Sequence, residues 1–290
     1  MGQMDKKLLI FGCGYSARFI CEKLIPDGWK IFGTTRKKND FAKLMKLKIE
    51  PVFWDDSATI ASILSEGCSL LSCIAPKGSF DDGLTRLLQL IKVNATTVNW
   101  IGYMSSTGVY GDRSGGWVTE DSALDTTTTQ GLARISAEKN WQILASEHQI
   151  PLFIFRIAGI YGPGRSVFDR IKAGTAQKVI KSGQYFNRIH VDDLAGAVSL
   201  SLLKPKLAGI YNISDNLPSS GADIIDEATK IIGISILPEV SFSDANLSTM
   251  ARSFYMDSKR VSNKKLTESL QYSLKYSDYF SGLRAIKRTG

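Results

Sequence analysis

The chain has 290 residues, of which 43% are hydrophobic, and a formal net charge of +8. This length is enough for one large hydrophobic core or two closely joined ones. No stretch reaches the ~18 apolar residues that span a bilayer, so we expect no membrane helix and no secretion signal. The basic residues are scattered rather than grouped in runs, which argues against nucleic-acid binding and favours a basic surface beside an anionic ligand.

The cysteines and histidines exclude two further kinds of site. The four cysteines make no C-x-x-C pattern, and most lie in apolar segments. We therefore expect reduced core thiols and a cytoplasmic protein. Because the two histidines have no clustered partners with metal-ligand spacing, we expect no catalytic metal.

Apolar runs and helical patterns alternate along the first half of the chain. Helices are predicted at 15–25, 59–66, 84–93 and 132–147. Strands are predicted at 8–11, 29–36, 49–54, 70–76, 98–104 and 152–155. This rhythm predicts an α/β fold of the Rossmann type, a doubly wound parallel sheet with its ligand at the carboxyl ends of the strands.

A glycine pattern follows the first predicted strand. Gly12, Gly14 and Ala17 form a G-x-G-x-x-A loop between that strand and the helix at 15–25. Gly12 permits the turn, Gly14 lets the backbone approach a pyrophosphate, and Ala17 lets the helix pack close to the strand. Since strand and helix flank the loop, the sequence predicts a dinucleotide site rather than a plain structural turn, with Tyr15 and Ser16 among its residues.

The end of the second strand indicates which dinucleotide is bound. A chain that prefers NAD usually has an acidic residue there for the ribose 2′-hydroxyl, but the first acid after this strand is Asp40. Thr35 and Arg36 occupy the strand end, and a hydroxyl and a guanidinium both suit a phosphate. We therefore expect NADP rather than NAD, the alternative being that Arg36 belongs to a solvated basic loop.

The pattern loosens beyond residue 160, where turns and shorter elements predict a substrate-binding lobe. We assign residues 1–158 to an NADP-binding Rossmann domain, with a return segment at about 187–213 that contains a helix at 194–203. Residues 159–186 and 214–290 are assigned to the smaller lobe.

Three later strings resemble one family. They are SSTGVYG at 105–111, RIAGIYGPGR at 156–165 and RIHVDDLA at 188–195. With the glycine loop they resemble the extended short-chain dehydrogenase/reductases, the NAD-dependent epimerase/dehydratase relatives, over residues 7–215. The resemblance implies hydride transfer between a nicotinamide and a sugar nucleotide or similar polar alcohol or ketone, and it implies a homodimer. Fold alone does not fix the chemistry.

The family's catalytic residues are a Ser, a Tyr and a Lys, the last two spaced Tyr-x-x-x-Lys. Ser106 stands where the family's Ser stands, but no tyrosine lies between Tyr110 and Tyr161. The Ala-Glu pair at 137–138 sets a register in which Gln130 replaces Tyr and Arg134 replaces Lys. A glutamine amide does not titrate near neutral pH, and an arginine can hold ribose hydroxyls but keeps its proton. The resemblance therefore narrows to atypical members of the family.

Three residues are candidates for the missing proton carrier. Tyr110 and Tyr161 carry phenols that could reach the pocket, although their family counterparts mainly pack or contact ligand. Glu120 is a further candidate acid in a loop. His190 is expected to be structural.

The resemblance also carries over pocket residues. Ala75 and Pro76 match the segment that lies along the cofactor, Asp55 matches the position near the adenine, and Gly159 borders the nicotinamide. The candidate anion clamps for a phosphorylated or nucleotide-linked substrate are Arg165, Arg188 and Arg252. Their alternative is surface charge.

Two functions remain open. The first is an NADP-dependent oxidoreductase of the epimerase/dehydratase type. The second, prompted by Gln130, is a catalytically impaired NADP(H)-binding sensor or interaction protein.

Overall fold

A computed structural model describes residues 6–78, 80–93 and 97–289 of the chain. These residues form two compact units. The first, here called the sheet unit, comprises 1–106, 128–156 and 194–211; the second unit comprises 107–127, 157–193 and 212–290. The domain limits derived from the sequence stay a prediction.

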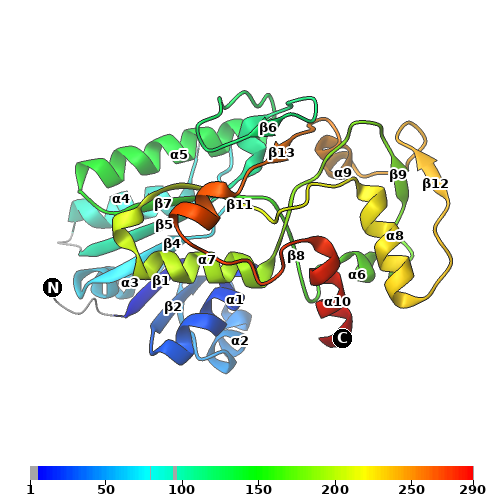
Figure 1. The fold of residues 1–290 in the computed structure, drawn as a ribbon. Helices are drawn as coiled ribbons and strands as arrows, with labels where there is room; N and C mark the ends of the chain where they lie inside the picture. The colour runs from blue at the N-terminus through cyan, green and yellow to red at the C-terminus, as the bar shows by residue number, and fades with distance from the viewer. Residues whose placement is uncertain (1–5, 79, 94–96, 290) are drawn as a thin grey trace. The chain divides into compact units, whose positions relative to one another are not determined.

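The sheet unit is built on seven strands in the order β11-β7-β5-β4-β1-β2-β3 (Figure 1). The strands are β1 (Lys7–Phe11), β2 (Lys30–Thr35), β3 (Glu50–Phe53), β4 (Cys68–Ser72), β5 (Val98–Ser106), β7 (Leu152–Ile157) and β11 (Gly209–Ile213). The pairs β1·β2, β2·β3, β1·β4 and β4·β5 all run parallel. Chain order reverses beside β1, and ligands of open α/β sheets bind at such a switch point, outside the carboxyl ends of the strands.

Helices cover both faces of this sheet. They are α1 (Tyr15–Leu24), α2 (Phe41–Lys46), α3 (Ser57–Ser65), α4 (Asp82–Val93), α5 (Thr129–Glu147) and α7 (Val191–Leu203). One face is closed by α3, α4 and α5, whose Ile60, Leu87 and Trp141 pack in one buried cluster with Phe11 of β1. Figure 1 shows α1 and α7 on the opposite face. Burying each large apolar side chain contributes about 1.5–3 kcal/mol, so this layered core dominates the unit's stability. The predicted Rossmann-type fold is confirmed.

The second unit consists of short elements. The strands pair in twos, all parallel: β8 (Gly159–Tyr161) with β10 (Arg188–His190), β9 (Lys178–Ile180) with β12 (Glu239–Ser241), and β6 (Trp117–Val118) with β13 (Arg260–Val261). The helices of this unit are α6 (Val167–Lys172), α8 (Gly221–Ile232), α9 (Thr249–Phe254) and α10 (Tyr279–Thr289). Short helical turns in the two units lie at Ile25–Asp27, Lys38–Asp40, Thr107–Tyr110, Pro205–Leu207 and Lys265–Ser269. Its core joins α8 and α10 through Ile225 and Leu283.

The described residues contain neither a membrane-spanning helix nor a metal-binding cluster. None of their helices is both long and apolar enough to cross a bilayer. No group of three or more His, Cys, Asp or Glu side chains among them is arranged to hold a metal ion.

Candidate functional site

The loop between β1 and α1 is shaped by Gly12. Its φ is +83°, in the left-handed region, and a Cβ added there would lie 2.9 Å from Cγ1 of Ile74. The Gly12 amide donates to the Thr34 hydroxyl at 3.0 Å, and the Cys13 amide donates to the Thr34 carbonyl oxygen at 3.3 Å. Both contacts tie the turn to β2. The fold itself therefore needs glycine at this position.

Gly14 has a different reason to be glycine. A Cβ added to Gly14 would meet no atom within 4 Å, and its backbone is extended, with φ −90°. Gly14 is also the N-cap of α1; glycine has no side chain to cap the helix, and the described first turn of α1 contains no acidic residue. The positive end of the helix thus faces open space. Such a place suits a pyrophosphate, whose oxygens accept from helix N-terminal amides.

The other predicted loop residues lie where the pattern puts them. Tyr15 and Ser16 form the half-buried first turn of α1, and Ala17 is 1% exposed, packed against the sheet. A larger side chain at 17 would push α1 away from β1 and move its amides.

Arg36 stands just beyond the end of β2 and is exposed. Its Nη2 lies 2.6 Å from Oδ2 of Asp82, and its guanidinium lies over the Trp54 ring, 5.4 Å from the centroid. Thr35 is half-buried, and its hydroxyl is 3.4 Å from the carboxylate of Asp40. The strand end therefore presents a cation and a hydroxyl.

The ends of β3 and β4 complete this edge of the sheet unit. Asp55 is exposed just after β3, while Ala75 is exposed and Pro76 half-buried in the loop after β4. Both segments follow the carboxyl ends of strands: β4 pairs with β1, which leads into the Gly12 turn, and β3 pairs with β2, which leads into Arg36. The structure thus brings the predicted cofactor residues of this unit to one edge.

Arg134 joins α5 to the end of β5. Its Nη1 donates to the carbonyl oxygen of Met104 and, at 3.3 Å, to the Tyr103 hydroxyl. Ser106 ends β5 and is half-buried. Gln130 lies one helical turn before Arg134, exposed at the start of α5. The end of β5 and the start of α5 thus hold the residues that the sequence assigned to catalysis, namely Ser106, Gln130 and Arg134.

The phenol that accepts from Arg134 is not a proton carrier near neutral pH. Burial raises the pKa of the Tyr103 phenol well above its usual value, so it stays protonated.

A buried ion pair supports the same helix. Arg156 on β7 and Glu138 on α5 are 2.8 Å apart at their closest atoms, and each side chain is 3% exposed. Ser105 donates to the same carboxylate at 2.5 Å. The sequence analysis used Glu138 only to align this helix with the family's motif. It missed the buried network, because a charged residue in a predicted helix is expected to face solvent.

In the second unit, Tyr110 is fully buried and donates to Oδ1 of Asn212 at 2.6 Å. Glu120 accepts from the Asn212 amide at 2.8 Å. His190 is buried, accepts from the Asp192 amide at 3.1 Å, and packs edge-on against Tyr161. Each of these side chains is engaged by the fold, and the roles assigned to them from the sequence stay predictions.

The remaining predicted residues also belong to the second unit. Gly159 opens β8, paired with Arg188 of β10. Arg188 donates to the Ser219 hydroxyl at 2.8 Å and to three carbonyl oxygens, and Arg252 donates to the Ala245 carbonyl oxygen at 2.9 Å. Arg165 is exposed in the turn before α6. Roles as anion clamps stay a prediction for all three arginines, and two of them are already engaged by the fold.

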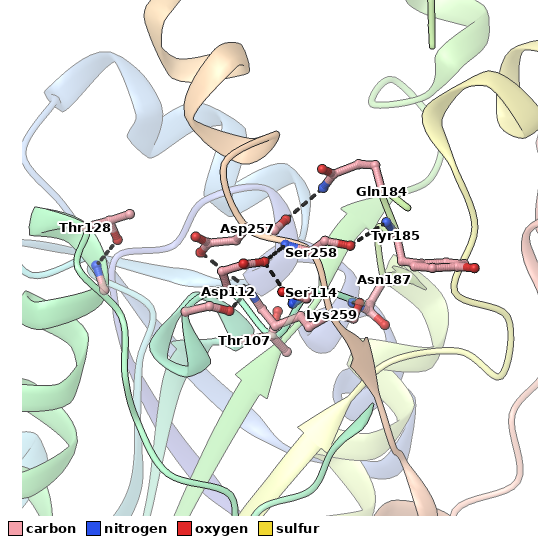
Figure 2. Close-up of polar contacts among 12 residues, drawn as sticks. Thr107, Asp112, Ser114, Thr128, Gln184, Tyr185, Asn187, Asp257, Ser258 and Lys259 are labelled. Atoms are coloured by element: carbon pink, nitrogen blue, oxygen red, sulfur yellow. Dashed lines mark hydrogen bonds and ion pairs between the residues drawn. The ribbon is translucent and has the colours of Figure 1, made fainter. Parts of the chain in front are cut away.

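A polar network missed by the sequence analysis surrounds Lys259 (Figure 2). Its buried Nζ donates to the Gly111 carbonyl oxygen at 2.8 Å, and Asp112 accepts from the Ser258 amide at 2.7 Å. Tyr255 and Lys259 have the spacing Tyr-x-x-x-Lys, but only Tyr255 adjoins a helix, α9, and Lys259 precedes β13 in irregular backbone. The network ties the segment before β13 to the turn that ends in Gly111.

The family follows from comparison with known proteins. The model of the NAD dependent epimerase/dehydratase family matches residues 8–214. The chain belongs to the NAD-dependent epimerase/dehydratase family. Protein YeeZ of Escherichia coli K12 is 30% identical over 223 residues, which cover 72% of this chain and 77% of YeeZ. The family resemblance stated from the sequence is confirmed.

Two solved structures have folds similar to that of this chain. A conserved protein of unknown function from Silicibacter pomeroyi is 38% identical, with a TM-score of 0.87 and 98% of both chains covered. The human epimerase family protein SDR39U1, solved with NADPH, is 14% identical, with a TM-score of 0.77 and 98% and 100% of the two chains covered. At that identity the second likeness concerns the fold alone.

Proposed function

We propose that this epimerase/dehydratase family protein binds NADP(H) and transfers hydride to or from a sugar nucleotide or a similar polar alcohol or ketone. The observation that carries the proposal is the open space over Gly14 at the N-terminus of α1. Gly12 is explained by the fold, whereas Gly14 is explained by a ligand whose phosphates approach the helix.

The preference for NADP rests on the end of β2. Arg36 can form paired hydrogen bonds with a 2′-phosphate, and no acidic residue stands at the strand end to accept from a 2′-hydroxyl. SDR39U1, which was solved with NADPH, shares the fold and is consistent with this preference.

The chain's own residues divide the remaining work. When bound, the nicotinamide supplies hydride exchange between its C4 and a substrate carbon. Ser106 at the end of β5 is suited to hold the substrate oxygen, and Arg134 is suited to hold hydroxyl groups with its charged donors. Gln130 can position a ligand by hydrogen bonds but moves no proton. In this proposal the proton comes from solvent or from the substrate.

A second function is favoured by Gln130. A protein that binds NADP(H) at the same edge without turnover would serve as a sensor, with the ligand altering a partner's binding. The cytoplasmic location and the homodimer stay predictions of the sequence.

The two functions separate in a turnover screen. The purified protein is mixed with NADPH or NADP⁺ and a panel of sugar nucleotides and small ketones, and absorbance of the reduced nicotinamide is followed. Turnover that disappears in Ser106→Ala supports the oxidoreductase. NADPH binding without turnover across the panel, retained in Ser106→Ala, contradicts the oxidoreductase and supports the sensor.

Restoring the family's residues sharpens that result. In Gln130→Tyr with Arg134→Lys, the phenol and amine lie on one face of α5, one turn apart. Gained turnover would show that only the proton carrier is missing from the site.

A further inference from the structure

Asp82, the first residue of α4, contacts the predicted phosphate-binding arginine. Its Oδ2 lies 2.6 Å from Nη2 of Arg36, and the two side chains are 40% and 54% exposed. The residues are far apart in sequence, and both belong to the sheet unit. The guanidinium expected to receive a 2′-phosphate thus already holds a carboxylate.

Helix α4 also supplies a cation. Arg86 lies one helical turn after Asp82; its Nη2 donates to the Trp54 carbonyl oxygen at 3.0 Å, and its guanidinium is 5.9 Å from the Trp54 ring centroid. Arg36 lies over the same ring. Trp54 therefore contacts two cations, and one of them, Arg36, is the partner of Asp82.

We propose that Asp82 moderates the preference for NADP(H) over NAD(H) by competing with the 2′-phosphate for Arg36; this rests on the proposed function. A phosphate monoester carries up to two negative charges and would approach the carboxylate that holds Arg36. The ribose of NAD(H) carries no such charge, so its binding leaves the Arg36–Asp82 pair intact. Asp82 thus weakens the NADP(H) complex selectively and moderates the preference that Arg36 creates.

The size of the effect follows from exposed charges. An exposed ion pair of this kind contributes enough to change affinity up to about fivefold, and the 2′-phosphate has to displace Asp82 to reach Arg36. Removing the Asp82 charge should therefore strengthen NADPH binding about fivefold at low salt, and less at high salt.

The test is a calorimetric titration of wild type and Asp82→Asn with NADPH and with NADH. The start of α4 is capped by Asp81, whose Oδ1 accepts from the Leu84 amide at 3.1 Å, so Asp82→Asn leaves the cap in place. We expect NADPH to bind about fivefold tighter to Asp82→Asn, with NADH affinity unchanged within about twofold. In an Arg36→Met background the Asp82→Asn gain should vanish. Glu66→Gln, which removes an exposed acid paired with Lys7 at 2.9 Å at the amino end of β1, is the matched control and should change neither affinity.

Three results would overturn the proposal while the protein still binds NADPH. They are unchanged NADPH affinity in Asp82→Asn, equal gains for both dinucleotides, and a gain that persists in Arg36→Met. Loss of NADH affinity in Asp82→Asn would also contradict it, because it would make Asp82 a ribose ligand. Wild-type protein that binds neither dinucleotide would instead refute the proposed function, and this inference with it.

Discussion

Arg134 on α5 donates a hydrogen bond to the carbonyl oxygen of Met104 on β5, just before Ser106. This contact fixes the start of α5 against the strand end at which the family places its catalytic serine. It also engages a side chain that the proposed function assigns to ligand binding. Arg134 therefore holds the fold together here and, in the proposed function, also binds the ligand.

Arg134→Met should lower both the stability of the protein and its affinity for NADPH. Loss of its hydrogen bonds to Met104 and Tyr103 should lower the free energy of unfolding by about 1–3 kcal/mol. NADPH affinity should fall about tenfold, since a charged hydrogen bond contributes about 1.5–3 kcal/mol. Urea unfolding and calorimetry measure the two effects. Arg134→Lys should recover most of the affinity, and a lysine variant as weak as methionine would show that charge at this position does not bind the ligand.

Gly14→Ala and Gly12→Ala should separate ligand binding from folding. At Gly14 the added Cβ meets open space in an extended backbone, so the free energy of unfolding should change by no more than about 1 kcal/mol. NADPH affinity should fall at least about tenfold, because the methyl group occupies the pyrophosphate's approach. At Gly12 the left-handed φ and the contact with Ile74 should lower stability by about 2 kcal/mol or more. Unchanged NADPH affinity in Gly14→Ala would place the ligand elsewhere.

The Glu138–Arg156 pair should behave as a buried unit. Glu138→Gln leaves the Arg156 charge buried without its counter-ion, which should cost about 3–5 kcal/mol in urea unfolding. Adding Arg156→Met should recover a large part of that loss, because no isolated charge then remains. A double variant as unstable as the sum of the single variants would contradict this account.

Asp215 makes stability pH-dependent. Burial raises the pKa of its carboxyl to about 7, while burial lowers the pKa of the Arg188 guanidinium to about 10. Since the folded-state pKa of Asp215 lies above its usual value of 3.8, its contribution to stability is complete below about pH 4. That contribution is lost as pH rises to about 7, by an amount on the order of a few kcal/mol.

Asp215→Asn stays neutral and keeps an acceptor for the Leu217 amide, now bonded at 3.1 Å. The melting temperature of Asp215→Asn relative to wild type should therefore rise between pH 5 and pH 8, whatever the offset at pH 5. A constant difference over that range would show that Asp215 is ionised in the folded protein as it is in the unfolded chain.

Cys13 should be the most reactive thiol. A hydrogen bond from the Cys21 thiol, together with the charge of Arg18, lowers the pKa of Cys13. Burial raises the pKa of Cys68 to about 12 and also raises that of Cys73. Iodoacetamide should therefore modify Cys13 first, as read by mass spectrometry of peptides.

Because Cys13 lies in the Gly12–Ala17 loop, bound NADPH should slow its alkylation. Cys13→Ala is the control and should leave only slow modification of buried thiols. Alkylation of Cys13 at the same rate with and without saturating NADPH would argue against ligand at this loop.

The sheet unit could be predicted from sequence because its signals are local. The apolar run before Gly12 and the helix after Gly14 lie side by side in the chain, and the alternation of strands and helices implies the parallel sheet. The start of α5 was missed: the helix begins at Thr129, since the Thr128 hydroxyl accepts from the Gly131 amide at 3.1 Å (Figure 2). Apolar spacing does not report such a cap.

Contacts between distant segments could not be predicted. Neither the Arg36–Asp82 pair nor the Lys259–Gly111 contact has a sequence pattern, because each depends on how loops from separate elements meet. The pairs β6·β13 and β9·β12 are too short for a two-residue period to be visible. In the second unit, therefore, the sequence suggested individual site residues but could not predict their positions in the fold.

The most direct test of the central claim is the affinity of the wild-type protein for NADPH and for NADH, measured by calorimetry in one buffer. The account predicts that NADPH binds about tenfold tighter or more, and that Arg36→Met removes most of the difference by weakening NADPH alone. Equal affinities, tighter binding of NADH, or a preference that survives Arg36→Met would contradict it.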